Sequence, residues 1–498
     1  MQFKGRTVVI IMVLSVCVSC VITLAFRDKI PHILQISSSE SSISQTANTS
    51  VDTPVSSAAK SSLREQDLKK IENIYHLIEK KFIQEIDHDK LVSGAINGML
   101  EALEDPYTVY MDEKESKQFS ESISSSFEGI GAEVSIEGGK VIVVSPIKGS
   151  PAEKAGIQSN DIVLSVNGEK LEGLTLGQAA LKIRGAKGTQ AKLELIRNGY
   201  VNPIFVVVVR DEIDVETVYA SMLEQGIGKI EIRQFSSNTA VDFKNELVKL
   251  EENGLKGLII DVRNNPGGLL NIVVEIAEQF VPNGKPIVQV ENRYGTREPT
   301  LSKGNTKNYP VTILINKGSA SASEILAGAL EETIGSQLVG ETTYGKGTVQ
   351  VTFENELGDG SNLKMTAYKW LTPSGNWINK TGIKPTIAVS QPSYFKSAMF
   401  SKESTLMPDT THEEVKNLQV MLKGLGYELD REDGYYSETT VEAVRMFQKK
   451  HGLNTSGEVD VPTANQLEKL LLQEIRNPKN DAQLLAAIES ILIEMKSP

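Results

Sequence analysis

Three short segments contain residue types that together could carry out covalent chemistry. The first, VTILINKGSASASEILAGAL at residues 311–330, predicts an apolar strand, a turn of small residues and a helix that begins at the serines. A hydroxyl in that turn would lie at a helix N-terminus, where unpaired N–H groups and the helix dipole stabilise developing negative charge. The segment predicts a nucleophilic serine, and plain capping of the helix by Ser319, Ser321 and Ser323 is the structural alternative.

The second segment, GETTYGKGTVQ at residues 340–350, places Lys346 between two glycines and before an apolar strand. Because other backbone can approach such a lysine closely, its ammonium group could be buried instead of solvated. Burial is what would bring a lysine pKa from ~10.4 down to about 7 or 8, where the amine can act as a base. Gln350 would share a strand face with Lys346, so its amide could orient the amine. The structural alternative is an exposed lysine.

The third segment, LIIDVRNNPGGLL at residues 258–270, predicts a buried strand that opens into a Pro-Gly-Gly turn. Glycines let backbone N–H groups point at a ligand, as an oxyanion hole requires, although an ordinary turn is the alternative. No histidine occurs between His88 and His412, and the two cysteines, Cys17 and Cys20, lie near the N-terminus. Chemistry at these segments would therefore need a base other than imidazole and a nucleophile other than a thiol.

The elements that must position these segments alternate between strands and helices, which predicts an α/β core over residues 211–395. The expected strands are 229–232, 258–262, 311–315 and 348–353, and the expected helices include 241–250 and 323–330.

Other parts of the chain have different patterns. Helical spacing of apolar side chains dominates residues 63–117, whereas residues 118–210 predict short strands, with a hairpin signal at Asn198-Gly199. A link at residues 396–411 leads to a compact helical domain at residues 412–472 and an amphipathic helix within residues 473–498.

Residues 7–26 form an uncharged apolar stretch, preceded by Lys4 and Arg6, that is long enough to cross ~30 Å of hydrocarbon as a helix. We therefore expect a cytosolic N-terminus at residues 1–6, a transmembrane anchor at residues 7–26 and a flexible serine-rich linker at residues 27–62. The body of the protein would then lie outside the cytoplasmic membrane. A cleaved signal peptide and a lipoprotein anchor at Cys20 are the alternatives.

Composition excludes several classes of function. The chain has 498 residues, which at ~150 residues per domain corresponds to about three domains. Its net charge of −12 repels polyanions, so nucleic acid is not an expected partner. The sequence has no glycine-rich phosphate loop, no His-Glu-x-x-His motif and no carboxylate metal cluster, so we expect no cofactor and no metal.

The chain resembles the C-terminal processing peptidases, also called tail-specific proteases, which use a Ser-Lys dyad. The resemblance rests on the motifs SASASE, YGKGTVQ and DVRNNPGG, which occur in the order and spacing of that family. The segment TPSGNWINKTGIKP at residues 372–385 is similar to the closing signature of that family, and the resemblance covers about residues 65–395. It implies that Ser321 is the nucleophile, that Lys346 is the general base and that Gln350 orients the base. It further implies oxyanion donors at the backbone N–H groups of Gly267 and Ala322. Ser319 and Ser323 would then be structural caps, and Glu324 would supply charge at the helix N-terminus.

Two flanking regions resemble binding modules. The motifs FEGIGA, SPAEKAG and DIVLSVNGEKL, within residues 127–171, look like a PDZ domain, which adds a peptide as a strand and captures its C-terminal carboxylate. The resemblance places that capture in the loop of Gly129, Ile130, Gly131 and Ala132, and Arg184 could couple peptide binding to the active site. A PDZ fold that only packs against the core is the alternative.

Residues 415–467, with the element DGYYSETT, resemble a three-helix peptidoglycan-binding domain. Its expected core consists of Leu418, Leu422, Leu425, Val441, Val444 and Phe447.

The expected fold class is therefore multidomain α/β. A membrane helix and a helical segment precede a PDZ domain, which is inserted before an α/β serine-protease core, and a three-helix peptidoglycan-binding domain follows. We expect a single-pass protein of the bacterial cell envelope that recognises protein C-termini and cleaves its substrates as a serine endopeptidase.

A wall-anchored adaptor with an inactive core and a peptidase acting on peptidoglycan peptides are the competing hypotheses. A homodimer is predicted from the apolar faces of the helices at residues 65–103 and of the C-terminal helix.

Overall fold

The computed structural model describes residues 21–22, 64–124, 126–147, 149–174, 176–197, 202–354, 356–400, 402 and 404–496. The predicted N-terminus at residues 1–6, the linker at residues 27–62, the hairpin at Asn198-Gly199 and nearly all of the predicted anchor lie outside these residues. Among the residues that are described, none of the helices has the length and apolarity needed to cross a lipid bilayer.

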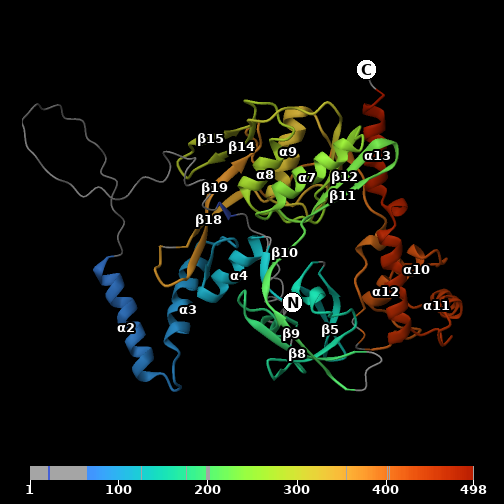
Figure 1. The fold of residues 1–498 in the computed structure, drawn as a ribbon, viewed down its shortest axis with the longest axis horizontal. Coiled ribbons are helices and arrows are strands. Elements are labelled where there is room, and N and C mark those ends of the chain that lie inside the picture. The colour runs from blue at the N-terminus through green and yellow to red at the C-terminus, as the bar shows by residue number, and fades with distance from the viewer. Residues whose placement is uncertain are drawn as a thin grey trace, which may run out of the picture. The chain divides into compact units, whose positions relative to one another are not determined.

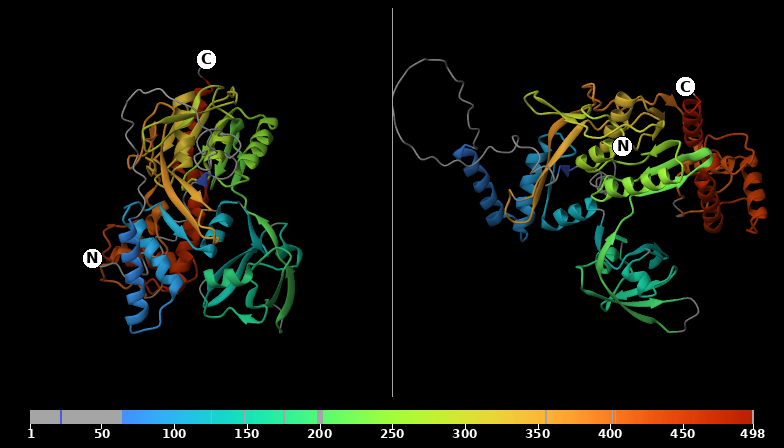
Figure 2. Two further views of the ribbon diagram at one scale, coloured as in Figure 1. Left: turned by 90° about the vertical axis from the view of Figure 1, so that its left-hand side faces the viewer. Right: turned by 45° about the horizontal axis from the view of Figure 1, so that its top comes forward.

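Contacts within the chain divide the described part into two units. One contains residues 118–349 and 367–496, and the other contains residues 64–117 and 350–366. The second unit includes helices α2 (Glu65–Lys81) and α3 (His88–Glu101), which Figures 1 and 2 show in blue. Asp87 caps α3 by accepting a hydrogen bond from Lys90 N, yet neither helix buries a single residue.

The part that resembles a PDZ domain is a six-stranded antiparallel sheet with its own apolar core. The strand order is β4 (Ala132–Glu137), β5 (Lys140–Pro146), β6 (Ile162–Val166), β8 (Gln190–Ile196) and β9 (Ile204–Val209), with β7 (Glu169–Lys170) on β6. Helices α5 (Pro151–Lys154) and α6 (Leu176–Ile183) accompany it. A separate ribbon pairs β3 (Ser126–Gly129) with β10 (Asp211–Asp214). The short strands predicted within residues 118–210 are confirmed.

The predicted α/β core is built on a mostly parallel sheet. Its strand order is β11 (Val218–Met222), β12 (Ile227–Ile232), β13 (Gly257–Asp261), β16 (Val311–Ile315), β17 (Gln337–Gly340) and β20 (Ile387–Ala388). Only the β11–β12 pair is antiparallel. Helices α7 (Thr239–Glu252), α8 (Leu270–Ala277) and α9 (Ala322–Ile334) are labelled in Figure 1. Every residue of β13 and β16 is buried, as parallel strands that are covered on both faces require.

The strand predicted at residues 348–353 belongs to a different sheet. This strand, β18 (Thr348–Phe353), is followed in the strand order by β19 (Asn362–Leu371), β14 (Pro286–Glu291) and β15 (Arg297–Leu301). Strand β2 (Val109–Met111) pairs with β19, and the short strand β1 (Val21–Ile22) is also assigned to this sheet. Helix α4 (Glu113–Ile123) follows β2. The predicted strand at residues 348–353 is therefore confirmed, although it lies in a different sheet from the other three predicted strands.

The C-terminal region contains a helical module, α10 (Glu413–Gly424), α11 (Glu438–Lys450) and α12 (Val461–Arg476). Of its expected core, Leu425 is partly buried, and the other five residues are buried in one apolar cluster. The last helix, α13 (Ala482–Glu494), instead packs against β13, β16 and β17 of the core sheet.

The apolar face of α13 is covered within the chain. Leu484, Ala487 and Ile491 lie in one cluster with Ile259 and Leu314. This face was predicted to contribute to a dimer, and that prediction is wrong because the core sheet already covers it.

Candidate active site

Ser321 lies at the N-cap of α9, immediately after the turn that follows β16. It is 1% exposed, and its φ of +54° is unusual for a residue with a side chain. Its two neighbouring serines have structural hydrogen bonds, because Ser319 Oγ donates to Val262 O and Ser323 Oγ donates to Asn265 O, both over 2.8 Å. These bonds tie the serine turn to the segment that follows β13.

Glu324 joins the serine segment to the lysine segment. Its carboxylate has no solvent exposure, and Oε2 accepts hydrogen bonds from the backbone N–H groups of Ser321 (2.8 Å) and Lys346 (2.9 Å). Oε1 accepts from Thr343 Oγ1 (2.6 Å) and from Gly345 N (2.7 Å). Burial raises the pKa of Glu324, while these four hydrogen bonds act in the opposite direction.

Glu324 was expected only to supply charge at the helix N-terminus, but its carboxylate also binds the lysine segment. The four-residue pattern from Ser321 to Glu324 matches a capping box, and that was the signal that could have identified its bond to Ser321 N. The bonds to Thr343, Gly345 and Lys346 come from a segment about twenty residues away, so no local pattern could have shown them.

Lys346 is buried, with 1% exposure, as its two flanking glycines predicted. Gly345 has a φ of +88°, and an added Cβ would lie 2.8 Å from Gly382 N. The Lys346 carbonyl accepts a hydrogen bond from Trp370 Nε1 (2.6 Å), and the Gly347 carbonyl accepts one from Trp377 Nε1 (2.8 Å). The two tryptophans of the chain therefore both bind the backbone of the lysine turn.

The segment at residues 372–385, whose sequence resembles a closing signature, packs on this same turn. Lys380 N donates to Gly345 O over 2.8 Å, and Thr343 N donates to Ile383 O over 3.1 Å. Gly347 N donates to Asn379 Oδ1. These bonds attach the segment to the turn that carries the buried lysine.

The Pro-Gly-Gly turn lies against the candidate nucleophile. An added Cβ on Gly267, whose φ is +107°, would be 2.9 Å from Ser321 Cβ and 3.1 Å from Ala322 N. A Cβ on Gly268 would lie 2.1 Å from Phe235 O. The turn thus brings Gly267, Ser321 and Ala322 together, as predicted. In this structure the N–H of Gly267 donates to Asn265 Oδ1 over 2.9 Å.

Gln350 lies on β18 in the second unit and has no solvent exposure. Its Nε2 donates to Thr366 Oγ1 over 3.0 Å. The burial of this amide agrees with the predicted strand face, whereas its partner on β19 could not be inferred from the local pattern.

In the PDZ-like part, the loop from Gly129 to Ala132 joins β3 to β4. Gly131 has a φ of +75°, and an added Cβ would lie 2.4 Å from Ser150 Cβ, so only glycine fits there. Gly131 O accepts a hydrogen bond from Ser150 Oγ, and Ile130 O accepts one from Ala152 N. The start of α5 therefore fixes this loop.

Arg184 makes contacts beside the start of the same loop. Its guanidinium lies 4.6 Å from the centre of the Phe127 ring and 3.7 Å from Glu121 Oε2 of α4. At the end of α4, Ile123 O accepts hydrogen bonds from Ser237 N and Ser237 Oγ, just before α7 of the core. Arg184 is thus connected through α4 to the core.

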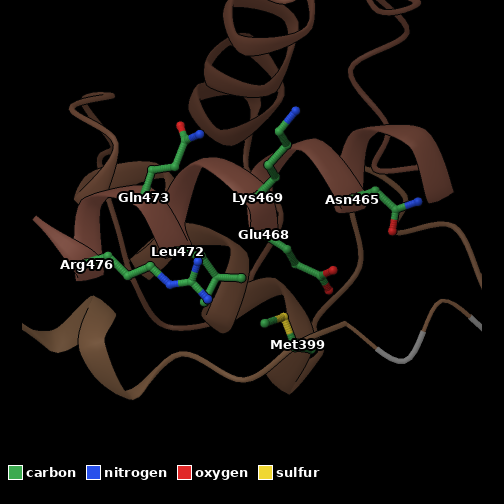
Figure 3. Close-up of a pocket in the computed structure, with 7 residues that line it drawn as sticks. All are labelled: Met399, Asn465, Glu468, Lys469, Leu472, Gln473 and Arg476. Atoms are coloured by element: carbon green, nitrogen blue, oxygen red, sulfur yellow. The ribbon is translucent and has the colours of Figure 1, made fainter. Parts of the chain in front are cut away.

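A cavity of about 430 Å³ runs along α12 in the C-terminal module (Figure 3). Its lining is mostly polar, and Glu468 is committed to Phe400 N and Lys402 Nζ. Lys469 and Arg476 line it without an ion-pair partner in the described part of the chain. The cavity contains none of the predicted catalytic residues. No cluster of three or more metal-binding side chains occurs among the described residues.

Comparison with known families assigns most parts of the chain. Residues 226–389 match the model of Peptidase family S41, and residues 33–115 match the N-terminal domain of the activating protease CtpB. Residues 142–197 match a PDZ domain, and residues 411–467 match a peptidoglycan binding domain.

Similar proteins agree with these matches. The carboxy-terminal processing protease CtpB of Bacillus subtilis is 48% identical over 434 residues, which cover 86% of this chain and 90% of that protein. The carboxy-terminal processing protease CtpA of the same organism is 44% identical, with the same coverage. Among solved structures, the photosystem II D1 C-terminal processing protease is 28% identical, with a TM-score of 0.40, covering 65% of this chain and 86% of that one.

Proposed function

This chain belongs to the carboxy-terminal processing proteases, serine peptidases that hydrolyse peptide bonds, and on this premise we propose that Ser321 and Lys346 form its catalytic dyad. The observation that carries the proposal is the single carboxylate oxygen of Glu324 that binds the backbone N–H groups of both residues. The two nitrogens therefore lie no further apart than the sum of two hydrogen-bond lengths.

In the proposed mechanism, neutral Lys346 removes the Ser321 proton while Ser321 Oγ attacks the peptide carbonyl carbon. Lys346 then gives the proton to the leaving amine, and water hydrolyses the acyl-enzyme. The burial of Lys346 supports this role, because desolvation disfavours the charged form of an amine. Gln350 orients the amine in this proposal.

The N–H groups of Ala322 and Gly267 are the proposed oxyanion donors. Ala322 N belongs to the first turn of α9, where the helix dipole favours negative charge. Gly267 N must exchange its bond to Asn265 Oδ1 for a bond to the substrate oxygen. Before that exchange, the oxyanion hole of the resting enzyme would be incomplete. An incomplete hole fits a protease that has to avoid indiscriminate cleavage.

We propose that the PDZ domain selects substrates by their free C-termini, through the loop from Gly129 to Ala132. The contacts of Arg184 with Glu121 and Phe127 support a role in coupling peptide binding to the core. A peptide strand that displaced either contact would act on α4 and so on Ser237.

The location in the cell and the assembly state are also proposals. The region that matches a peptidoglycan binding domain supports a place in the cell envelope, with the apolar stretch at residues 7–26 as a membrane anchor. We propose that a second copy covers the apolar side chains that helices α2 and α3 expose, which are Leu68, Ile71, Ile74, Leu77, Val92 and Met99.

The test of the proposed function uses the full chain and fluorescein-labelled β-casein, an unstructured protein with an apolar C-terminus. We expect Ser321→Ala and Lys346→Met each to abolish cleavage, and Ser374→Ala, a change at an exposed serine, to have no effect. Equal rates for the parent and Ser321→Ala would remove Ser321 from the mechanism. An Arg184→Ala variant tests the coupling: we expect it to lower cleavage of casein, while unchanged rates would show that Arg184 has no such role.

A further inference from the structure

A line of hydrogen bonds leads away from Gln350 within the second unit. Gln350 Nε2 donates to Thr366 Oγ1 (3.0 Å), and Thr366 N donates to Thr108 Oγ1 (3.1 Å). Thr108 Oγ1 in turn donates to Asp105 Oδ2 (2.5 Å). The line thus connects the amide on β18 to the Asp-Pro-Tyr-Thr segment that precedes β2.

The directions of these bonds are fixed by chemistry. The Asp105 carboxylate can only accept, so Thr108 must give it the hydroxyl hydrogen and keep its lone pairs for Thr366 N. The amide nitrogen of Gln350 can only donate, so Thr366 Oγ1 is the acceptor. With Nε2 committed in this way, the oxygen Oε1 remains as the acceptor end of the Gln350 amide.

Thr108 binds Thr366 at the point where regular strand pairing stops. The β2–β19 ladder pairs Met111 with Asn362, Tyr110 with Leu363 and Val109 with Lys364, and it goes no further. The Thr108 hydroxyl therefore takes the place of the backbone acceptor that a longer ladder would provide for Thr366 N. The turn held by Asp105, which also accepts from Tyr107 N, gives Thr108 this position.

We propose that Thr366 is a positioning residue for catalysis, which selects the end of the Gln350 amide that serves the lysine base. Neutral Lys346 must keep its lone pair for the Ser321 proton, so only its N–H donors are left for Gln350 and only the carbonyl end of the amide can orient it. Thr108 and Asp105 hold the backbone of Thr366 for this purpose. The inference rests on the proposed role of Gln350, and it makes the segment at residues 105–108 part of the catalytic apparatus.

The test compares Thr366→Val with Thr366→Ser in the full chain, with β-casein as the probe. Valine keeps the shape of threonine but cannot accept a hydrogen bond, so we expect kcat to fall about tenfold, as the loss of one hydrogen bond predicts, while KM stays constant. Serine keeps the acceptor and is expected to keep kcat close to that of the parent. Thr108→Val and Thr108→Ser should show the same contrast more weakly.

The pH profile separates positioning from packing. The carbonyl of Gln350 stabilises the ammonium form of the lysine when it faces the amine. In Thr366→Val the amide would no longer be held in that orientation, so the acidic limb of the kcat profile should move to lower pH. A change in folding alone would lower the active fraction without moving that limb. Thr352→Val is the matched control, because Thr352 also lies on β18 and its buried hydroxyl has no hydrogen-bond partner in the described part of the chain.

Two results would overturn the proposal. One is a Thr366→Val variant that matches Thr352→Val in kcat and in its acidic limb, and the other is a Thr366→Ser variant as slow as Thr366→Val. Both are distinct from a failure of the proposed function, in which Ser321→Ala would still cleave casein. If Ser321→Ala is inactive and Thr366→Val is unchanged, the dyad stands and the positioning role is wrong.

Discussion

Glu324 accepts hydrogen bonds from both segments of the proposed dyad, and it does so without any exposure to solvent. Each carboxylate oxygen accepts two hydrogen bonds, so the four donors are satisfied while the carboxylate is ionised. Because burial holds the pKa of Glu324 above its usual value, acidification protonates it earlier than an exposed glutamate. Protonation would place a hydrogen among four donors and loosen the site.

This residue gives a sharp prediction. In Glu324→Gln, the new NH₂ group would face two donors, and burying each unpaired donor costs about 1–3 kcal/mol. Since the lysine segment would lose the bond from Gly345 N or the bond from Lys346 N, whichever oxygen is replaced, we expect kcat to fall about 100-fold, or about 2.7 kcal/mol. The measurement is casein cleavage, with Glu298→Gln at an exposed carboxylate of β15 as the control. Full activity in Glu324→Gln would show that another contact holds the segments together.

Much of the site could be predicted residue by residue, since glycines, a buried lysine and a serine turn have local signatures. The sequence could not reveal Thr366 as a partner of Gln350, because that contact depends on the register of β2 with β19. The bond between Gly267 N and Asn265 Oδ1 was missed for a similar reason. Pro-Gly-Gly indicates a turn that can expose N–H groups, but it does not say which acceptor they meet.

At the scale of elements, α13 is held on the core by a charged cluster at its N-terminus. Arg263, two residues after β13, binds both Asp261 and Asp481, and Lys229 also contacts Asp261. Asp481 in turn caps α13 by accepting from Leu484 N. Arg263 belongs to the same segment as the Pro-Gly-Gly turn, so the last helix is attached directly beside the proposed oxyanion donors.

Replacing Asp481 should weaken the attachment of α13 to the core sheet. Burial tends to raise the pKa of Asp481, but the hydrogen bond and charge of Arg263 outweigh it, and the pKa lies below its usual value. The carboxylate therefore stabilises the fold above the unfolded pKa of about 3.9, and this contribution disappears as the pH falls through the lower folded value. At neutral pH, we expect Asp481→Asn to cost about 2 kcal/mol, so that amides of α13 exchange about 30-fold faster.

Hydrogen exchange followed by mass spectrometry measures this change at pH 7, and an acid titration of stability should bring parent and variant together. Asp433→Asn is a suitable control, since that exposed aspartate pairs only with a neighbour on its own loop. Unchanged exchange in α13 would mean that its apolar face alone holds it on the sheet.

Strands and helices of the core were predictable because buried parallel strands appear as continuous apolar runs, as in β13 and β16. The position of α13 was not predictable. Its apolar stripe at Leu484, Ala487 and Ile491 predicts that this face of the helix is buried. The same stripe would be expected whether the face packs on a sheet of its own chain or on a second copy of the protein. Membership of β18 in a separate sheet likewise depends on pairing between distant segments.

At the scale of the whole molecule, α2 has an apolar face that the described part of the chain leaves uncovered. Ile71 is 52% exposed and Ile74 is 50% exposed, although the helix has a clear apolar side. We expect the full chain in mild detergent to sediment as a dimer. Burying one isoleucine contributes about 1.5–3 kcal/mol, so Ile71→Glu should raise the dimer dissociation constant at least about tenfold.

Lys70→Glu, a charge change at an exposed polar position of the same helix, is the matched control and should leave the dimer intact. Sedimentation velocity over a range of concentrations measures both variants. A parent chain that remains a monomer at every concentration would rule out this assembly.

The two tryptophans of the chain, Trp370 and Trp377, both donate their indole N–H to carbonyls of the lysine turn. All tryptophan fluorescence of the protein therefore originates at one place. Any event that shifts this turn, such as the arrival of a substrate chain or the acylation of Ser321, should change the emission of the unlabelled enzyme. The molecule thus carries an intrinsic optical reporter at its proposed reaction centre, and the order of binding and chemistry can be timed by stopped flow.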